Sequence, residues 1–197
     1  ANLVEAALDR GCQRFIYLSS LSIYGTISQP VVDESTPIHN PDVYGATKYE
    51  GEQSLLTHQA ELSSFSLRLP GVLGPGAHRN WLSGLAAKLR AGETISAFNL
   101  SAPFNNACHV VDMAHLIVGL CGRVWKGADA VVLGARGSIT VRGAIERLAD
   151  ALGVEPDISE VEAREPGFIL SSERAISRWG YDPMEIGDMI ERYGRES

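Results

Sequence analysis

Tyr44 and Lys48 stand four residues apart in the run Tyr44-Gly-Ala-Thr-Lys48. Positions i and i+4 lie on one face of a helix, so a phenol and an ammonium would face the same space. A free phenol has a pKa of about 10 and is a poor base at neutral pH, but a nearby fixed positive charge favours the phenolate. Such a pair can exchange a proton with an alcohol or carbonyl oxygen. The alternative interpretation is an ordinary surface pair on a helix.

A hydroxyl that holds the substrate oxygen would complete such a site, and Ser20 is the candidate. The preceding run, Arg14-Phe-Ile-Tyr-Leu18, is apolar and rich in β-forming residues, which predicts a strand covered on both faces in a parallel sheet. Ligands of open α/β sheets bind at the carboxyl ends of the strands. Ser20 is therefore predicted to lie where a ligand would bind.

The elements that must position these residues alternate along the chain, which favours an α/β fold with a parallel sheet. We expect a cap at Thr140 and another at Asp112, and a helix end near Gly92. The proline-rich stretch 25–43 is predicted to be a functional loop. Strands are expected at 14–18, 64–69 and 131–133, helices at 1–10, 43–60, 80–90, 112–124, 140–152, 172–179 and 185–193, and a glycine-rich loop at 70–76.

Composition excludes several classes of function. The chain has 197 residues, 45% of them hydrophobic, and a formal net charge of -7, which argues against disorder and against nucleic acid as a partner. No apolar run is long enough to span a bilayer, so we expect no membrane partner and a cytoplasmic protein. The three cysteines, Cys12, Cys108 and Cys121, lie in apolar stretches and are predicted to be reduced core residues.

Four runs occur in the order typical of one family: Ser19-Ser-Leu-Ser-Ile-Tyr-Gly25, Tyr44-Gly-Ala-Thr-Lys48, Arg68-Leu-Pro-Gly-Val-Leu-Gly-Pro75 and His109-Val-Val-Asp112. Together they resemble the extended short-chain dehydrogenase/reductase family, the NAD-dependent epimerases and dehydratases. The segments 2–7, 132–141 and 179–183 extend the resemblance over essentially the whole chain. It implies an incomplete Rossmann-like parallel sheet, with its late part at about 1–75. A small C-terminal α/β substrate-binding region would follow at about 76–197, and the strand near 131–133 would return to the sheet.

The resemblance also implies roles for individual residues. Tyr44 would be the acid/base, Lys48 would favour its phenolate and bind the nicotinamide ribose, and Ser20 would bind the reacting oxygen. Ser19 is the less favoured choice for that hydroxyl. NAD or NADP would be the cofactor, a sugar nucleotide or related small molecule the substrate, and an epimerase or oxidoreductase reaction the function. Besides Tyr44 and Lys48, the implied cofactor contacts are Leu18, Ser19, Leu69 and Pro70, and the implied substrate contacts are Ser20, Ser22, Gly71 and Asn105.

Three departures from the family pattern narrow the expectation. Leu21 and Ser22 stand where sugar-nucleotide dehydratases carry an acidic pair, which disfavours elimination of water. Asn105 stands where many sugar-nucleotide enzymes carry an arginine, and an amide cannot supply that charged contact with a diphosphate. Gly71 replaces an asparagine often found beside the substrate.

The family's glycine-rich dinucleotide turn and the acid that follows it are not in this sequence. The run Gly71-Val-Leu-Gly-Pro-Gly76 resembles the turn only superficially, because it follows a late strand and Pro75 opposes a helix start. The sequence also begins without Met, and its first residues already show the apolar periodicity of a helix. We therefore expect the C-terminal two thirds of the enzyme. A catalytically silent fragment that acts through partner binding or dimerisation is the alternative.

Other candidates are weaker. The five histidines show no spacing typical of metal ligands, and no Gly-x-Ser-x-Gly elbow for hydrolysis is present. His78 is interpreted as an exposed loop residue rather than a substrate contact, and Arg136 would face either substrate or solvent. Apolar faces at 1–10 and 44–60 resemble those through which family members form homodimers, although plain core packing explains them equally well.

Overall fold

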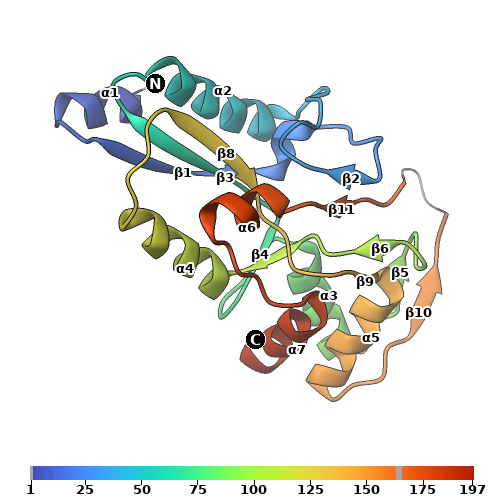
Figure 1. Ribbon diagram of the computed structural model, residues 1–197. Coiled ribbons are helices and arrows are strands. Elements are labelled where there is room, and N and C mark those ends of the chain that lie inside the picture. Colours follow the sequence, from blue (N-terminus) through green and yellow to red (C-terminus); the bar gives the residue numbers. More distant parts are fainter. Residues whose placement is uncertain (1, 163–165) are drawn as a thin grey trace.

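A three-stranded parallel sheet lies at the centre of the computed structural model, which describes residues 2–162 and 166–197 (Figure 1). Its strands are β1 (Arg14–Ser20), β3 (Ser63–Leu69) and β8 (Ala128–Val132), in the order β1-β3-β8. The register of β1 on β3 runs from Arg14 opposite Ser63 to Ser20 opposite Leu69. The parallel sheet and the α/β class are as the sequence predicts.

Helices cover both faces of this sheet. Helices α1 (Asn2–Asp9) and α2 (Val43–Thr57) lie on one face, and α4 (Val110–Cys121) and α6 (Glu173–Trp179) lie on the other (Figure 1). A small cluster that includes Val4 and Leu55 joins the first pair of helices to the sheet. On the opposite face, Phe65 and Leu67 of β3 share a larger apolar cluster with Leu116 of α4. Burial on both sides of β3 fixes the sheet between two helical layers.

A second apolar core lies away from the sheet, where α3 (Trp81–Ala91), α5 (Val141–Leu152) and α7 (Ile186–Glu196) pack together (Figure 1). Parallel strands β5 (Ile95–Ala97) and β10 (Ile158–Glu160) lie at its edge. Asn80 and Thr140 cap α3 and α5, and Gly92 and Gly153 end them in the left-handed region. The predicted boundaries of these two helices are confirmed.

Short strands occupy segments that the sequence analysis expects to be loops. In the stretch 25–43, β2 (Val31–Val32) pairs with β11 (Ile169–Leu170), and in the glycine-rich stretch, β4 (Gly71–Leu73) pairs with β7 (Ala107–His109). A further pair joins β6 (Pro103–Phe104) to β9 (Ile139–Thr140). Strands of two or three residues show no periodicity in sequence, which is why these pairings were not predicted.

The structure corrects two expectations about burial. Strand β1 is covered only in part: Leu18 is 44% exposed, and β1 lies at the edge of the sheet, where it pairs only with β3 among the described residues. The three cysteines are free, as expected, but only Cys108 is a core residue. Cys12 and Cys121 are exposed: Cys12 lies in the connection between α1 and β1, and Cys121 is the last residue of α4.

The expected cap at Asp112 is also wrong. Helix α4 begins at Val110, and the ring nitrogen Nδ1 of its cap, His109, accepts a hydrogen bond from Val111 N at 3.3 Å. Asp112 is buried in the first turn, where its carboxylate accepts a hydrogen bond from Met184 N at 3.0 Å. Among the described residues, no helix is both long and apolar enough to cross a membrane.

Candidate active site

Ser20 is the last residue of β1, at the carboxyl end of the sheet edge, as the sequence predicts. It caps the 3-10 helix η1 (Leu21–Tyr24), and its Oγ accepts a hydrogen bond from Ser22 N at 3.1 Å. The same hydroxyl donates to Ser22 Oγ at 3.2 Å. Because Ser20 is only half-buried, a substrate oxygen could replace Ser22 Oγ as the acceptor of this hydrogen bond. The two serines thus form one hydroxyl pair.

Ser19 differs from Ser20 in its surroundings. Successive residues of a strand point to opposite faces, so the two hydroxyls lie on different sides of the sheet. Ser19 is 3% exposed, and its Oγ has no hydrogen-bond partner among the described residues. A buried hydroxyl without a partner is uncommon in a native structure and calls for an explanation.

The first turn of helix α2 packs unusually closely on η1, next to the end of β1. The Asp42 carboxylate caps the helix by accepting a hydrogen bond from Gly45 N at 2.7 Å. A Cβ atom built on Gly45 would lie 2.1 Å from the carbonyl oxygen of Ser22, a distance that no real side chain tolerates. Glycine at this position therefore lets the first turn of α2 pack directly on η1, and Tyr44 is the residue just before it.

Lys48 links α2 to β1. Its Nζ donates a hydrogen bond to the carbonyl oxygen of Leu18 at 2.8 Å. The same atom lies 5.7 Å from the ring centroid of Tyr44 and 5.2 Å from that of Tyr17, both within the range of cation–π attraction. Tyr44 is 53% exposed, so its hydroxyl is accessible to a ligand. The predicted phenol–ammonium pair is present, and it lies beside the strand that ends in Ser20.

Leu69 lies directly opposite Ser20 across the sheet, at the end of β3. Leu69 and the adjacent Pro70 are half-buried, and Gly71 begins β4. A Cβ atom on Gly71 would lie 3.1 Å from the Cβ of Asn80, the cap of α3. The segment after β3 therefore runs from the Ser20 edge to the start of α3.

Asn105 has a structural role. It is 4% exposed, and its Nδ2 donates to the carbonyl oxygens of Ala135 at 3.2 Å and Leu170 at 2.9 Å. Its Oδ1 accepts from Leu170 N at 2.7 Å. The amide thus uses both donors inside the protein, so neither is left for the expected contact with a substrate. Arg136, whose environment the sequence left open, forms a 2.7 Å surface ion pair with Asp182.

Sequence reasoning missed a buried network beneath the candidate site. Arg68 of β3 forms an ion pair with Glu52 of α2, with Nη2 and Oε2 2.8 Å apart, and its Nη1 donates to the hydroxyl of Tyr24 at 2.8 Å. That hydroxyl donates to the carbonyl oxygen of Asp33 at 2.7 Å. Burial raises the pKa of Tyr24 to about 12, although the adjacent guanidinium lowers it. The network ties α2, β3 and the segment after η1 together.

The sequence offered only weak signals for this network. Glu52 and Arg68 are separated by 16 positions and lie on different elements, so neither spacing nor periodicity pairs them. The one available signal was a charged residue inside the predicted apolar strand 64–69, because a buried charge requires a partner. No cluster of metal-ligating residues occurs in the described part of the chain.

Residues 1–134 match the model of the NAD dependent epimerase/dehydratase family. The chain belongs to this family. The expected fold and relationship are thereby confirmed. Family membership also agrees with the expected cofactor, a nicotinamide dinucleotide, because the family is NAD-dependent by description. It does not by itself fix the reaction or the substrate.

Curated relatives within the family differ in their named activities. Over 124 residues, 58% of this chain, it is 31% identical to 3beta-hydroxysteroid-dehydrogenase/decarboxylase isoform 1 of Arabidopsis thaliana. Over 88 residues, 42% of the chain, it is 34% identical to the UDP-glucose 4-epimerase of Vibrio cholerae. The matched segments cover 27% and 26% of those proteins.

Solved structures show the same fold. The UDP-glucuronic acid 4-epimerase of Bacillus cereus in complex with NAD superposes with a TM-score of 0.82 at 18% identity, over 98% of this chain and 64% of that one. MoeE5 in complex with UDP-glucuronic acid and NAD superposes with a TM-score of 0.81 at 22% identity, over 98% and 68%. The chain thus corresponds to about two thirds of each of these structures.

The residues at the β1 edge fit the nicotinamide end of such a dinucleotide. The ammonium of Lys48 has three donors, of which one bonds Leu18 O, so two are available for ribose hydroxyls. The unpaired, buried Oγ of Ser19 is a further polar atom on this strand end. Leu69 and Pro70 are half-buried opposite Ser20 and supply apolar surface.

Proposed function

We propose that this chain carries the catalytic residues of an NAD(P)-dependent epimerase or oxidoreductase. The reaction is hydride transfer between the nicotinamide and a hydroxyl or keto carbon of a sugar nucleotide or related hydroxyl substrate. The observation that carries the proposal is the position of Lys48, which is bonded to the backbone of β1 and lies beside the Tyr44 ring. An ordinary surface pair would need no such anchor in the neighbouring strand.

Each residue has a distinct task in this reaction. Bound nicotinamide supplies the hydride acceptor or donor. Ser20 Oγ donates a hydrogen bond to the reacting oxygen, and Tyr44 removes the hydroxyl proton during oxidation and returns it during reduction. Lys48 stabilises the phenolate form of Tyr44 and binds the ribose. Leu18, Ser19, Leu69 and Pro70 contact the cofactor, and Ser22 and Gly71 lie on the substrate side.

The residues after Ser20 favour epimerisation or simple oxidoreduction over dehydration. Elimination of water requires a second acid or base near the reacting carbon. Leu21 cannot supply one, and Ser22 has its hydroxyl engaged with Ser20. The named relatives act on a UDP-sugar in one case and on a steroid alcohol in another, so both substrate classes belong in the test.

Replacement of Tyr44 by Phe tests the proposal in the complete natural polypeptide. Net reduction of NAD or NADP is followed with neutral alcohols as substrates. Interconversion of the two epimers is followed with UDP-hexoses, because epimerisation returns the hydride to the substrate. We expect kcat to fall at least about 100-fold, as for loss of a general acid/base, without a change in the thermal unfolding midpoint. Native mass spectrometry should first show a mass increment of one dinucleotide. Full turnover by the Phe variant would refute the assignment.

A further inference from the structure

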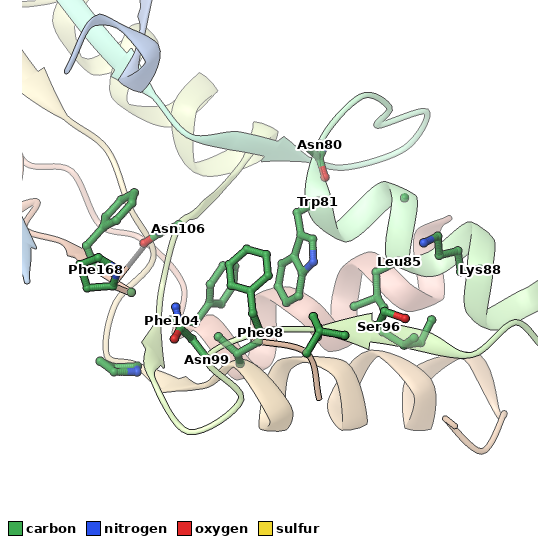
Figure 2. A pocket seen from close by; sticks show the side chains of 18 of the residues that line it. Asn80, Trp81, Leu85, Lys88, Ser96, Phe98, Asn99, Phe104, Asn106 and Phe168 are labelled. Carbon is green, nitrogen blue, oxygen red and sulfur yellow. The ribbon is translucent and has the colours of Figure 1, made fainter. Parts of the chain in front are cut away.

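The ammonium of Lys48 lies over two aromatic rings. In the cavity beside α3 and β5, aromatic rings instead meet one another: Trp81 and Phe104 contact edge to face, with ring centroids 4.9 Å apart (Figure 2). Such contacts are apolar packing with a preferred geometry. At Lys48, by contrast, the ring centroids of Tyr17 and Tyr44 lie 5.2 and 5.7 Å from a cation. The interaction there is electrostatic, because the negative face of each ring attracts the ammonium.

Tyr17 and the residue after it both contact this ammonium. The carbonyl oxygen of Leu18 accepts a hydrogen bond from Lys48 Nζ at 2.8 Å, and the Tyr17 ring lies beside the same atom. Gly51 stands three positions after Lys48, on the same face of α2. A side chain at Gly51 would overlap the Tyr17 hydroxyl, so glycine makes room for the ring against the helix. Adjacent residues of β1 thus hold one cation by two different contacts.

Tyr17 stays a neutral phenol in the pH range in which Tyr44 would work. Burial, the Glu52 carboxylate and the Tyr44 phenol all raise the pKa of Tyr17 above its ordinary value of about 10. A neutral ring attracts a cation through its face without neutralising the charge. The positive charge of Lys48 therefore remains available to Tyr44.

The other charged and titratable groups packed around α2 and β1 are engaged with different partners. Glu52, one turn after Lys48, forms an ion pair with Arg68, with Oε2 and Nη2 2.8 Å apart. The Asp42 carboxylate caps the first turn of α2. Tyr24 of η1 is bonded to Arg68, and burial raises its pKa to about 12. The position of the ammonium thus depends on the β1 carbonyl and the two rings.

We propose that Tyr17 is a positioning residue, whose ring holds the ammonium of Lys48 in the place from which it favours the phenolate of Tyr44. The inference deepens the proposed hydride-transfer function and rests on it. Tyr17 acts through Lys48, so loss of its ring leaves the cation present but less well fixed. A phenol beside a less fixed cation loses its proton at a higher pH.

Labelling of tyrosine with carbon-13 at the ring carbon that bears the hydroxyl tests the proposal without turnover. The Tyr44 resonance of the complete natural polypeptide is identified by its loss in Tyr44→Phe. In Tyr17→Leu, we expect this resonance to titrate about half a pH unit higher than in the wild-type protein, equivalent to about a threefold change in the phenolate equilibrium. No displacement, or displacement to lower pH, would overturn the proposal.

Two variants that keep a ring at this position guard against a general disturbance of folding. Tyr17→Phe retains the ring face and should titrate as the wild-type protein does. Tyr17→trifluorophenylalanine keeps the size of the ring but withdraws electrons from its face, so it should displace the Tyr44 titration in the same direction as Tyr17→Leu. Identical titrations in these two variants would contradict a cation–π contact.

Two further variants show whether the effect passes through Lys48. Phe15→Leu removes a ring from the same face of β1 and from the same apolar cluster as Tyr17, and it should leave the Tyr44 titration unchanged. In Lys48→Met the cation is absent, so adding Tyr17→Leu should give no further displacement. A displacement that persists in that background, or that Phe15→Leu reproduces, would show that Tyr17 acts only by packing.

Turnover separates this inference from the proposed function. With the UDP-hexoses and neutral alcohols used for Tyr44→Phe, Tyr17→Leu should move the acid limb of the kcat–pH profile upward by the same half unit, with KM unchanged. If Tyr44→Phe retains turnover while Tyr17→Leu displaces the Tyr44 titration, the hydride-transfer assignment fails and the role of Tyr17 is supported. If Tyr44→Phe is inactive and Tyr17→Leu displaces nothing, only the role of Tyr17 is refuted.

Discussion

Individual side chains at the β1 edge act through contacts with the backbone as much as with one another. The Lys48 ammonium bonds Leu18 O, and the Asp42 carboxylate bonds Gly45 N. Backbone atoms of a packed strand or helix move little, so each anchor fixes a functional group against a rigid reference. The orientation of Tyr44 relative to Ser20 therefore depends on a few single hydrogen bonds.

The three cysteines give a prediction at this scale. Burial raises the pKa of Cys108 to about 12, and Tyr181 donates a hydrogen bond to its sulfur at 3.4 Å. Because the raised pKa keeps the protonated thiol up to about that pH, Cys108 should resist thiol reagents at pH 8 to 10. Exposed Cys12 and Cys121 should react. Ellman's reagent should thus label two thiols in the native protein and three after denaturation in guanidinium.

Single replacements check the assignment of these thiols. Cys12→Ser and Cys121→Ser should each remove one rapidly reacting group. If Cys108→Ser removes a rapid group instead, the buried environment described for Cys108 is incorrect.

The α2–η1 contact shows how whole elements set the site. Gly45 allows the helix to approach the carbonyl oxygen of Ser22, and Gly51 similarly allows Tyr17 to approach the same helix, because a Cβ there would lie 2.4 Å from the Tyr17 hydroxyl. Two glycines within one helix would normally lower its stability by roughly 1 kcal/mol each. Close packing on β1 and η1 explains why they are present.

Replacement of Gly45 by Ala should therefore be costly. The new methyl group would overlap a backbone oxygen that cannot rotate away, so we expect a loss of about 1–3 kcal/mol in the free energy of unfolding. Gly119→Ala in α4 is the matched control, because nothing lies within 4 Å of its Cβ position, and it should stabilise the protein by about 0.5–1 kcal/mol. Urea unfolding measures both, and equal effects would argue against the close contact.

Local signals in the sequence predicted local structure. Thr140 was recognisable as a cap, and Asn80 as the approximate start of a helix, because both side chains bond the first turn of their own helix. Ser20 and Tyr44 were placed correctly because each lies at the end of an element. The Arg68–Glu52 pair and the β4–β7 pairing could not be predicted, since both depend on contacts between distant segments. The prediction of a helix cap at Asp112 was wrong for the same reason, because the hydrogen bond of Asp112 to Met184 N is also long-range.

At the scale of the whole molecule, apolar side chains remain exposed on the face formed by α1 and α2. Leu3 is 77% exposed and Leu56 is 43% exposed, while Val4 and Leu55 on the same helices are buried in the core. Plain core packing therefore explains only part of each apolar face. The remaining part suits a contact between two copies of the chain.

We expect this face to support a homodimer. Leu56→Glu would place a charge in the contact and should shift the sedimentation coefficient from dimer to monomer at micromolar concentration, without altering the circular dichroism spectrum. Val118→Glu is the control, because Val118 is 70% exposed on α4, on the opposite side of the sheet. A monomeric wild-type protein, or equal dissociation by both variants, would show that the face is not an interface.

The Arg68–Glu52 pair restrains rotation of α2, the helix that carries Tyr44. Apolar contacts are non-directional and let a helix roll or slide by small amounts, and α2 buries just one apolar side chain, Leu55, among the described residues. The planar guanidinium of Arg68 bonds the Glu52 carboxylate, which belongs to α2, and the Tyr24 hydroxyl. These directional contacts fix the rotation of α2 about its own axis. The direction in which the Tyr44 phenol points is thus set by directional polar contacts rather than by the amount of apolar surface that α2 buries.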